Sequence, residues 1–220
     1  EGAVVKTVYN GCGILCETMQ TATEDSNALP DAYYACDICF VPPVAHLFPE
    51  AVRLTETDIV IAVPAGNPAG LRTLADLAKP GLRVGACDTR QSALGFLTER
   101  LLDRNALGKA VGERIVSRTP TADLLVNQLR AGALDAAVVY RANVASLGDA
   151  VGIVPIDHPA AKAVQAYAVA ANSRHRQLSQ RLLVKLMANQ RTMLQAGFRL
   201  IHDPRPVPSK AFDSPGFEKQ

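Results

Sequence analysis

Hydrophobic and polar positions follow two different spacings along the chain, and together they predict strands interleaved with helices. Short apolar runs rich in β-branched residues, such as DIVIAV at 58–63, are typical of buried strands. Leucines at 94, 97, 101 and 102 recur at helical spacing and indicate a helix packed on a sheet. The predicted strands cover 3–11, 31–40, 57–68, 82–86, 115–116, 133–140, 153–156 and 164–170. The predicted helices cover 14–21, 44–48, 71–81, 92–104, 121–130, 174–188 and 190–196.

Alternating strands and helices predict an α/β protein with mainly parallel sheets. In such sheets a ligand lies beyond the carboxyl ends of the strands. Two polar loops of small residues end just before the helices expected at 92 and 121, and a third strand ends on Tyr140. Helix starts present unpaired N–H groups and a partial positive charge, so two of them facing one site would hold a small anion. The pattern favours an anion receptor over an enzyme.

Composition narrows the class of protein. With 220 residues, 48% of them hydrophobic, the chain can bury a sizeable core in one large domain or two small lobes. The net charge of +2 comes without a long basic run, which argues against nucleic acid as a partner. The longest apolar stretches have the length of strands, so we expect no membrane insertion. No signal peptide is visible, and because the chain opens at the edge of an expected strand, we expect that an N-terminal piece has been removed.

Five cysteines are many for a chain of this size, and four of them cluster early. Three interpretations remain open for Cys12, Cys16, Cys36 and Cys39. They are unpaired core thiols, one or two disulfides in an oxidising compartment, or a zinc or copper site. Cys87 stands apart, and an odd number leaves at least one thiol free within a single chain.

The order of several segments resembles a known family. The most specific are AVPAGNP followed by LADLAKPGLRVG, and LRAGALDAAVVYRANV; GCGILCETMQ, PDAYYACD and SALGFLTERLL occur in the matching order. In this order the chain resembles the type II periplasmic solute-binding proteins of ABC transporters, in their molybdate/tungstate-binding branch, over nearly its whole length.

The resemblance implies a two-lobed periplasmic-binding-protein-like fold (type II), with mostly parallel sheets and hinge strands. Lobe 1 would comprise 1–64 plus 157–220, and lobe 2 would comprise 65–156. The lobes would close on a tetrahedral oxyanion, molybdate or tungstate, held by hydroxyls and backbone N–H groups without a cofactor and without catalysis. The closed form would deliver the anion to an ABC transporter permease from a periplasmic or other extracytoplasmic location.

Position by position, the resemblance also implies a set of ligand-binding residues. A first-lobe loop, two second-lobe helix starts and a closing tyrosine supply them: Asn10, Gly11, Cys12, Gly13, Ser92, Ala93, Ala122 and Tyr140. The chain departs from the family pattern in three ways. The first strand, serine loop and helix of lobe 1 are missing ahead of Glu1, Cys12 stands where a serine is usual, and the cysteine cluster is additional.

Other chemistry has weaker support. Arg90 shares a loop with Ser92 and is expected on the surface, as are the four histidines. Asp37 and Asp88 have no apparent nucleophile–base partner, which disfavours an enzyme. Two other functions remain as alternatives. One is a metal- or redox-sensing protein that uses the cysteine cluster on a binding-protein fold. The other is the ligand-sensing domain of a transcription regulator, which would need a helix-turn-helix outside these 220 residues.

Overall fold

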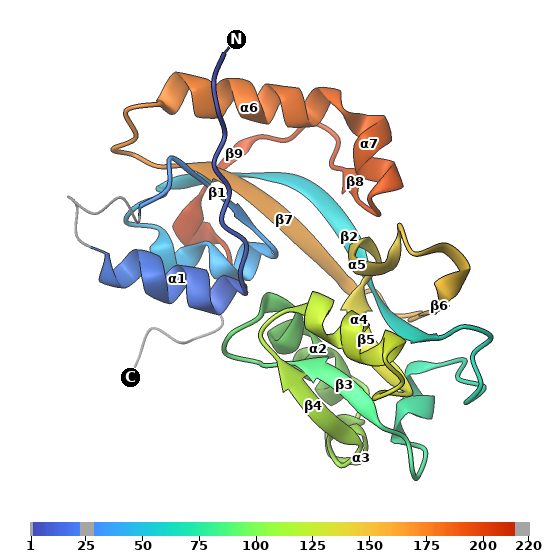
Figure 1. The fold of residues 1–220 in the computed structure, drawn as a ribbon. Helices are drawn as coiled ribbons and strands as arrows, with labels where there is room; N and C mark the ends of the chain where they lie inside the picture. The colour runs from blue at the N-terminus through green and yellow to red at the C-terminus, as the bar shows by residue number, and fades with distance from the viewer. Residues whose placement is uncertain (1, 23–28, 214–220) are drawn as a thin grey trace.

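Strand β2 (Glu50–Pro64) runs through both lobes of the molecule. In the computed structural model, which describes residues 2–22 and 29–213, β2 passes from the lobe around α1 to the lobe around α2 (Figure 1). Its first half mixes buried positions with exposed or half-buried ones, whereas Ile59–Val63 is buried throughout. Such a continuous apolar run is typical of a strand covered on both faces. The sequence of β2 thus changes character where the strand moves from one lobe to the other.

Lobe 1 is built on antiparallel strands. The sheet order is β1 (Ala32–Ala35), β7 (Lys162–Val169), then β2, with β8 (Arg199–Leu200) and β9 (Pro206–Pro208) also pairing with β2. Helix α1 (Cys12–Thr21) contributes buried residues to the core of this lobe, which also contains Phe40, Phe48 and Phe212. The helices α6 (Arg176–Ala188) and α7 (Gln190–Gln195) lie at the far end of the lobe (Figure 1).

Lobe 2 contains the parallel strands. Strand β3 (Val84–Cys87) lies between β4 (Ile115–Thr119) and β5 (Ala136–Tyr140) and pairs in parallel with both. Strands β5 and β6 (Val151–Pro155) pair with β2 in antiparallel fashion. The remaining helices belong to this lobe: α2 (Ala93–Arg104), α3 (Gly108–Gly112), α4 (Ala122–Arg130) and α5 (Arg141–Val144).

Helical periodicity explains how lobe 2 is packed. Helix α4 buries Ala122, Leu125, Val126 and Leu129, which follow the i, i+3, i+4, i+7 spacing of one helix face. These side chains join β2, β3 and β5 in the larger of the two hydrophobic cores. The smaller core lies in lobe 1, so each lobe has a core of its own, and β2 contributes to both.

The α/β two-lobed fold expected from the sequence is confirmed. Parallel pairing, however, is confined to β3, β4 and β5, and the other six strand pairings described are antiparallel. The reason is that β2 runs antiparallel to each strand that pairs with it: β5, β6, β7, β8 and β9. The expected helix at 71–81 is only a 3-10 turn at Leu74–Ala78. The helix expected at 44–48 is absent: a 3-10 turn at Pro42–Val44 is followed by further turns before β2 begins at Glu50.

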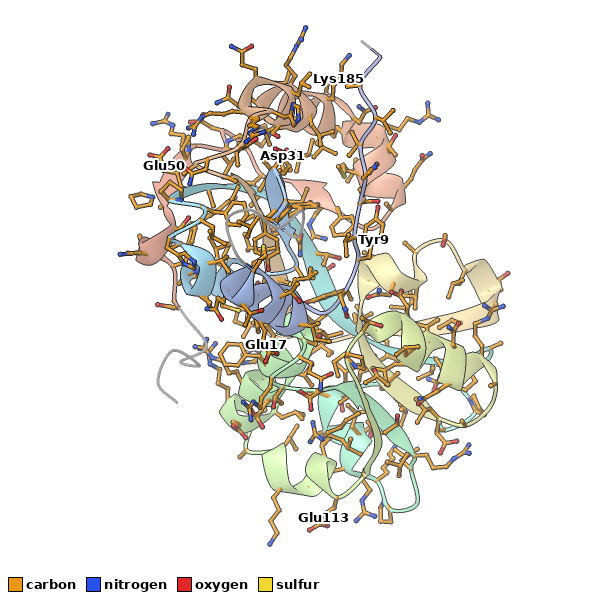
Figure 2. The ribbon with its side chains drawn as sticks, turned by 60° about the vertical axis from the view of Figure 1, so that its left-hand side comes forward. Tyr9, Glu17, Asp31, Glu50, Glu113 and Lys185 are labelled. Atoms are coloured by element: carbon orange, nitrogen blue, oxygen red, sulfur yellow. The ribbon has the colours of Figure 1, made fainter. Side chains whose placement is uncertain are left out.

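The strand expected at 3–11 is wrong. This segment runs extended outside both cores, and no described strand pairs with it. Val4, Val8 and Tyr9 are largely exposed, and Figure 2 shows Tyr9 on the extended segment at one side of the molecule. An alternating pattern becomes a strand only where a neighbour completes the hydrogen-bond ladder. Among the described residues, no helix is long and apolar enough to span a bilayer.

Candidate ligand-binding site

Three strand ends of lobe 2 lie together at one edge of its sheet. Because β3, β4 and β5 are parallel, their carboxyl ends emerge on the same side. The loop 88–92 follows β3, Pro120 and Thr121 follow β4, and Tyr140 ends β5. This edge is where an open parallel sheet holds a ligand.

The start of α1 in lobe 1 lies directly against this edge. The backbone N–H of Gly13 donates to the carbonyl of Gln91 over 3.0 Å. A Cβ added to Gly11 would lie 2.3 Å from the Gln91 oxygen and 2.6 Å from that of Pro120, and one added to Gly13 would lie 1.9 Å from the Arg90 oxygen. Only glycine allows the two backbones to approach so closely. We call this region, formed by 10–13, 88–93, 120–122 and Tyr140, the interlobe site.

Three helices begin at the interlobe site, and none has a side-chain cap. Their N-cap residues are Gly11 for α1, Ser92 for α2 and Thr121 for α4. The carboxylate of Asp88 instead accepts hydrogen bonds from the N–H groups of Arg90 and Gln91, each 2.9 Å long, and so shapes the loop before α2. Each helix has at least nine residues and carries a partial positive charge at its start. The three starts therefore bring backbone N–H groups to one region, beside the carboxylates of Asp88 and Asp123.

Tyr140 brings a hydroxyl to the site. Its oxygen is fully buried and has no hydrogen-bond partner among the described residues. The backbone around it is fixed, because its N–H donates to Asn143, whose side-chain amide donates in turn to Asp123 at the start of α4. Burial raises the pKa of the Tyr140 hydroxyl well above its ordinary value, and the nearby Cys36 and Asp37 raise it further. The hydroxyl therefore keeps its proton and can donate a hydrogen bond.

The structure brings the sequence-predicted residues together. Gly11 and Gly13 lie against the second-lobe loops, with the exposed Asn10 and the buried Cys12 beside them in the chain. Ser92 and Ala93 are buried at the start of α2, and Ala93 packs in the same core cluster as Cys12. Two of the expected donors are already used: the N–H of Gly11 bonds to the Asn10 side chain, and that of Gly13 bonds to Gln91. Arg90 is exposed, as expected. Surface hollows of about 220 and 330 Å³ lie elsewhere in lobe 2.

Sequence reasoning missed two neighbours of the site. Tyr33 lies in β1, Cys36 directly follows this strand, and both contact Cys12. Nothing in the spacing of these residues signals the contact, because it depends on how α1 packs against the turns that follow β1. The sequence offers one signal for this contact: Cys36 and Cys12 both belong to the early cluster of cysteines.

The cysteines are all free thiols in the structure. Cys12, Cys16 and Cys39 are buried in the core of lobe 1, and Cys36 is half-buried beside them. The thiol of Cys16 donates to the Phe40 carbonyl over 3.2 Å. In residues 2–22 and 29–213, no group of three or more His, Cys, Asp or Glu side chains is placed to hold a metal ion. The candidate four-cysteine metal site is therefore wrong for this part of the chain.

Asp37 has a structural role. Its carboxylate accepts the N–H of Cys39 over 3.0 Å and that of Val164 over 2.9 Å, which ties the turn after β1 to β7. Burial raises the pKa of Asp37, while these hydrogen bonds oppose the increase. Both acceptor oxygens are engaged by the backbone, so the side chain holds two elements together.

Comparison with known protein families matches residues 41–199 to the bacterial extracellular solute-binding proteins, which is well over half of the chain. The chain belongs to this family. The resemblance to type II periplasmic solute-binding proteins of the molybdate branch is thereby confirmed.

Individual relatives agree with this assignment. The molybdate-binding protein ModA of Mycobacterium bovis is 29% identical over 178 residues, which cover 78% of this chain and 66% of the relative, just under two thirds of its length. The periplasmic molybdate-binding protein of Azotobacter vinelandii has a similar fold, with a TM-score of 0.67 at 14% identity, covering 87% of this chain and 85% of that one. The sulfate-binding protein SubI of Mycobacterium tuberculosis gives 0.68 at 16% identity, covering 88% and 75%.

Proposed function

We propose that this protein is an extracytoplasmic receptor that captures a small tetrahedral oxyanion, molybdate or tungstate, and presents it to the permease of an ABC transporter. The observation that carries the proposal is the interlobe site itself. Three helix starts without side-chain caps and one buried hydroxyl without a partner meet where the lobes touch. A molybdate-binding relative at 29% identity supports the choice of anion.

Binding would rest on dipoles and hydrogen-bond donors. A dianion at the interlobe site is stabilised by the positive ends of α1, α2 and α4, and the N–H groups in the first turn of each helix point toward it. Tyr140 donates from its buried hydroxyl. Because the N–H groups of Gly11 and Gly13 are engaged, lobe 1 would contribute through the amide of Cys12.

Closure would be the signal to the transporter. The lobes we assign, 1–64 with 157–220 and 65–156, meet through the hydrogen bond from Gly13 to Gln91 and the close approach of Gly11 to Pro120. An anion between them would add attraction across the same interface, so its binding would favour the closed form. The permease would then recognise the surface that only the closed form presents. This is a binding role without a catalytic step.

Isothermal titration tests the proposal. The full chain is titrated with molybdate, tungstate and sulfate, since relatives of similar fold bind sulfate as well as molybdate. Sulfate carries the same charge as molybdate but is smaller, so discrimination would come from the size of the closed site. Tight binding of molybdate and tungstate with weaker binding of sulfate is expected. Binding of sulfate alone would overturn the choice of anion, and no binding of any of the three would overturn the oxyanion proposal.

A variant and its matched control locate the site. Tyr140→Phe should weaken molybdate binding about ten- to a hundredfold, because a hydrogen bond to a charged group contributes about 1.5–3 kcal/mol. Tyr167→Phe is the control: its hydroxyl donates to the Ser179 carbonyl, away from the interlobe site. Equal affinities of Tyr140→Phe and the unmodified protein for molybdate would show that the Tyr140 hydroxyl does not bind the anion.

A further inference from the structure

Two cysteines from different elements meet at the start of α1. Cys12 is the first residue of the helix, and Cys36 directly follows β1. The backbone N–H of Cys36 donates to the Cys12 sulfur over 3.1 Å. Cys12 is completely buried, and Cys36 is half-buried. The two residues are 24 positions apart in the sequence, and the packing of α1 against the 3-10 turns after β1, Ile38–Phe40 and Pro42–Val44, brings them into contact.

The surroundings of Cys12 favour its reactive form. Hydrogen bonding from the Cys36 side chain lowers the pKa of Cys12, and hydrogen bonds from the Cys36 N–H and the Tyr33 hydroxyl lower it further. Burial and the negative charge of Asp37 raise it, but the net effect is a lowered pKa. The start of a helix also favours a negative charge. Since the thiolate is the nucleophile in exchange with disulfides, Cys12 is suited to that reaction.

The neighbouring cysteines have the opposite character. Hydrogen bonding with Cys12, together with burial, raises the pKa of Cys36 well above its ordinary value, so Cys36 keeps its proton beside a Cys12 thiolate. Burial raises the pKa of Cys16 to about 12, and it also raises that of Cys39. Cys12 is therefore the expected attacking group, and Cys36 is the thiol beside it that can complete a bond.

Lobe 2 lies against the start of α1. The residues on either side of Cys12 are the glycines that touch Gln91, Pro120 and Arg90. Cys12 is completely buried and shares a core cluster with Ala93 of lobe 2, so opening of this interlobe contact would uncover the start of α1. The rate of reaction at Cys12 should therefore follow the opening of the lobes.

We propose that Cys12 and Cys36 form a reversible disulfide by exchange with a small external disulfide, and that the reaction proceeds in the open form of the protein. The Cys12 thiolate attacks one sulfur of the external disulfide, forms a mixed disulfide and releases one thiolate. The Cys36 sulfur then displaces the second thiolate, and its proton passes to a released sulfur. Two cysteines are oxidised by two electrons, and one external disulfide is reduced to one thiol and one thiolate. The reaction requires neither an oxyanion nor the proposed function.

Mapping of disulfides in the full chain tests this inference. The reduced protein is incubated with oxidised glutathione, quenched with acid, alkylated and digested for mass spectrometry. Two of the five free thiols should disappear, and a single cross-linked peptide should join Cys12 to Cys36. Retention of all five thiols would overturn the proposal, and so would a bond between any other two cysteines. This measurement uses the unmodified chain, so misfolding of a variant cannot affect its result.

Variants then test the order of the two exchange steps and the dependence of the reaction on lobe opening. In Cys36→Ser, Cys12 should accumulate as a mixed disulfide with glutathione, whereas the matched control Cys87→Ser in lobe 2 should form the same cross-link as the unmodified chain. Gly13→Ala should oxidise roughly tenfold faster, because an added methyl group against the Arg90 carbonyl opposes the closed form by about that factor. An unchanged rate in Gly13→Ala would refute the dependence on lobe opening.

Discussion

Replacing Tyr140 with phenylalanine should stabilise the protein when no anion is bound. The substitution removes a single oxygen, which is buried and has no hydrogen-bond partner among the described residues. On folding, that hydroxyl loses its bonds to water and gains none. Leaving a buried polar group unsatisfied costs about 1–3 kcal/mol. The free energy of unfolding of Tyr140→Phe should therefore rise by about 1 kcal/mol or more.

The control for this prediction is the same substitution at Tyr167. The ring of Tyr167 is only 3% exposed, and its hydroxyl donates to the Ser179 carbonyl over 2.8 Å. Removing that hydroxyl breaks a satisfied hydrogen bond, so Tyr167→Phe should lower the free energy of unfolding by about 0.5–1.5 kcal/mol. Urea denaturation of the three proteins, with their m-values compared to establish a common unfolded state, measures both changes.

The two variants should therefore differ in sign. Destabilisation of Tyr140→Phe by as much as Tyr167→Phe would show that the Tyr140 hydroxyl is satisfied without ligand, and the reasoning would fail. Saturating molybdate should then reverse the ranking, because a ligand stabilises the folded protein in proportion to the logarithm of its affinity. The unmodified protein should gain more stability from the anion than Tyr140→Phe gains.

Three further predictions concern the interlobe contact, the ion pairs and the core. Gly13→Ala should weaken anion binding by roughly tenfold, whereas Gly112→Ala, where an added Cβ meets nothing within 4 Å, should bind normally in the same titration. Hydrogen bonds from Arg199 hold the pKa of Asp58 in the folded protein below its ordinary value. This carboxylate therefore stabilises the folded state at any pH above its pKa in the unfolded chain, about 3.9. The stabilisation is lost as the pH falls through the lower pKa of the folded protein. The stabilities of the unmodified protein and Arg199→Gln should accordingly differ at pH 6 and converge below about pH 4 in denaturation curves. Leu125→Ala, at a fully buried position of the larger core, should lower the free energy of unfolding by about 2–5 kcal/mol in the same assay.

Much of this fold could be predicted from local pattern. The helix spacing of α4 and the apolar second half of β2 follow directly from residue order. The convergence of the second-lobe loops could also be predicted, because parallel strands must end at one edge. The segment 3–11 shows the limit of this reasoning: its alternation is that of a strand, yet pairing depends on a neighbour that its own sequence does not specify.

The part of the site that could not be predicted depends on contacts between distant segments. The approach of Cys36 to Cys12 is set by the packing of α1 on the turns that follow β1, and the use of the Gly13 N–H by Gln91 is set by the fit between the lobes. Neither contact leaves a periodic trace in the sequence. Mainly parallel pairing was expected from the alternation of strands and helices. That alternation does not reveal that β2 and β7 pair in antiparallel fashion in lobe 1.

The shared strand β2 has a consequence for how the chain can fold. Its residues Ala51 and Val52 are buried in lobe 1, whereas Ile59–Val63 belong to the core of lobe 2, all on one uninterrupted strand. If one lobe lost its structure, half of β2 would lose its partners while the other half remained held. Neither lobe is thus an independent folding unit, and melting should proceed as a single cooperative transition rather than in two stages. The strand that joins the two lobes also prevents either from being cut out and kept folded alone.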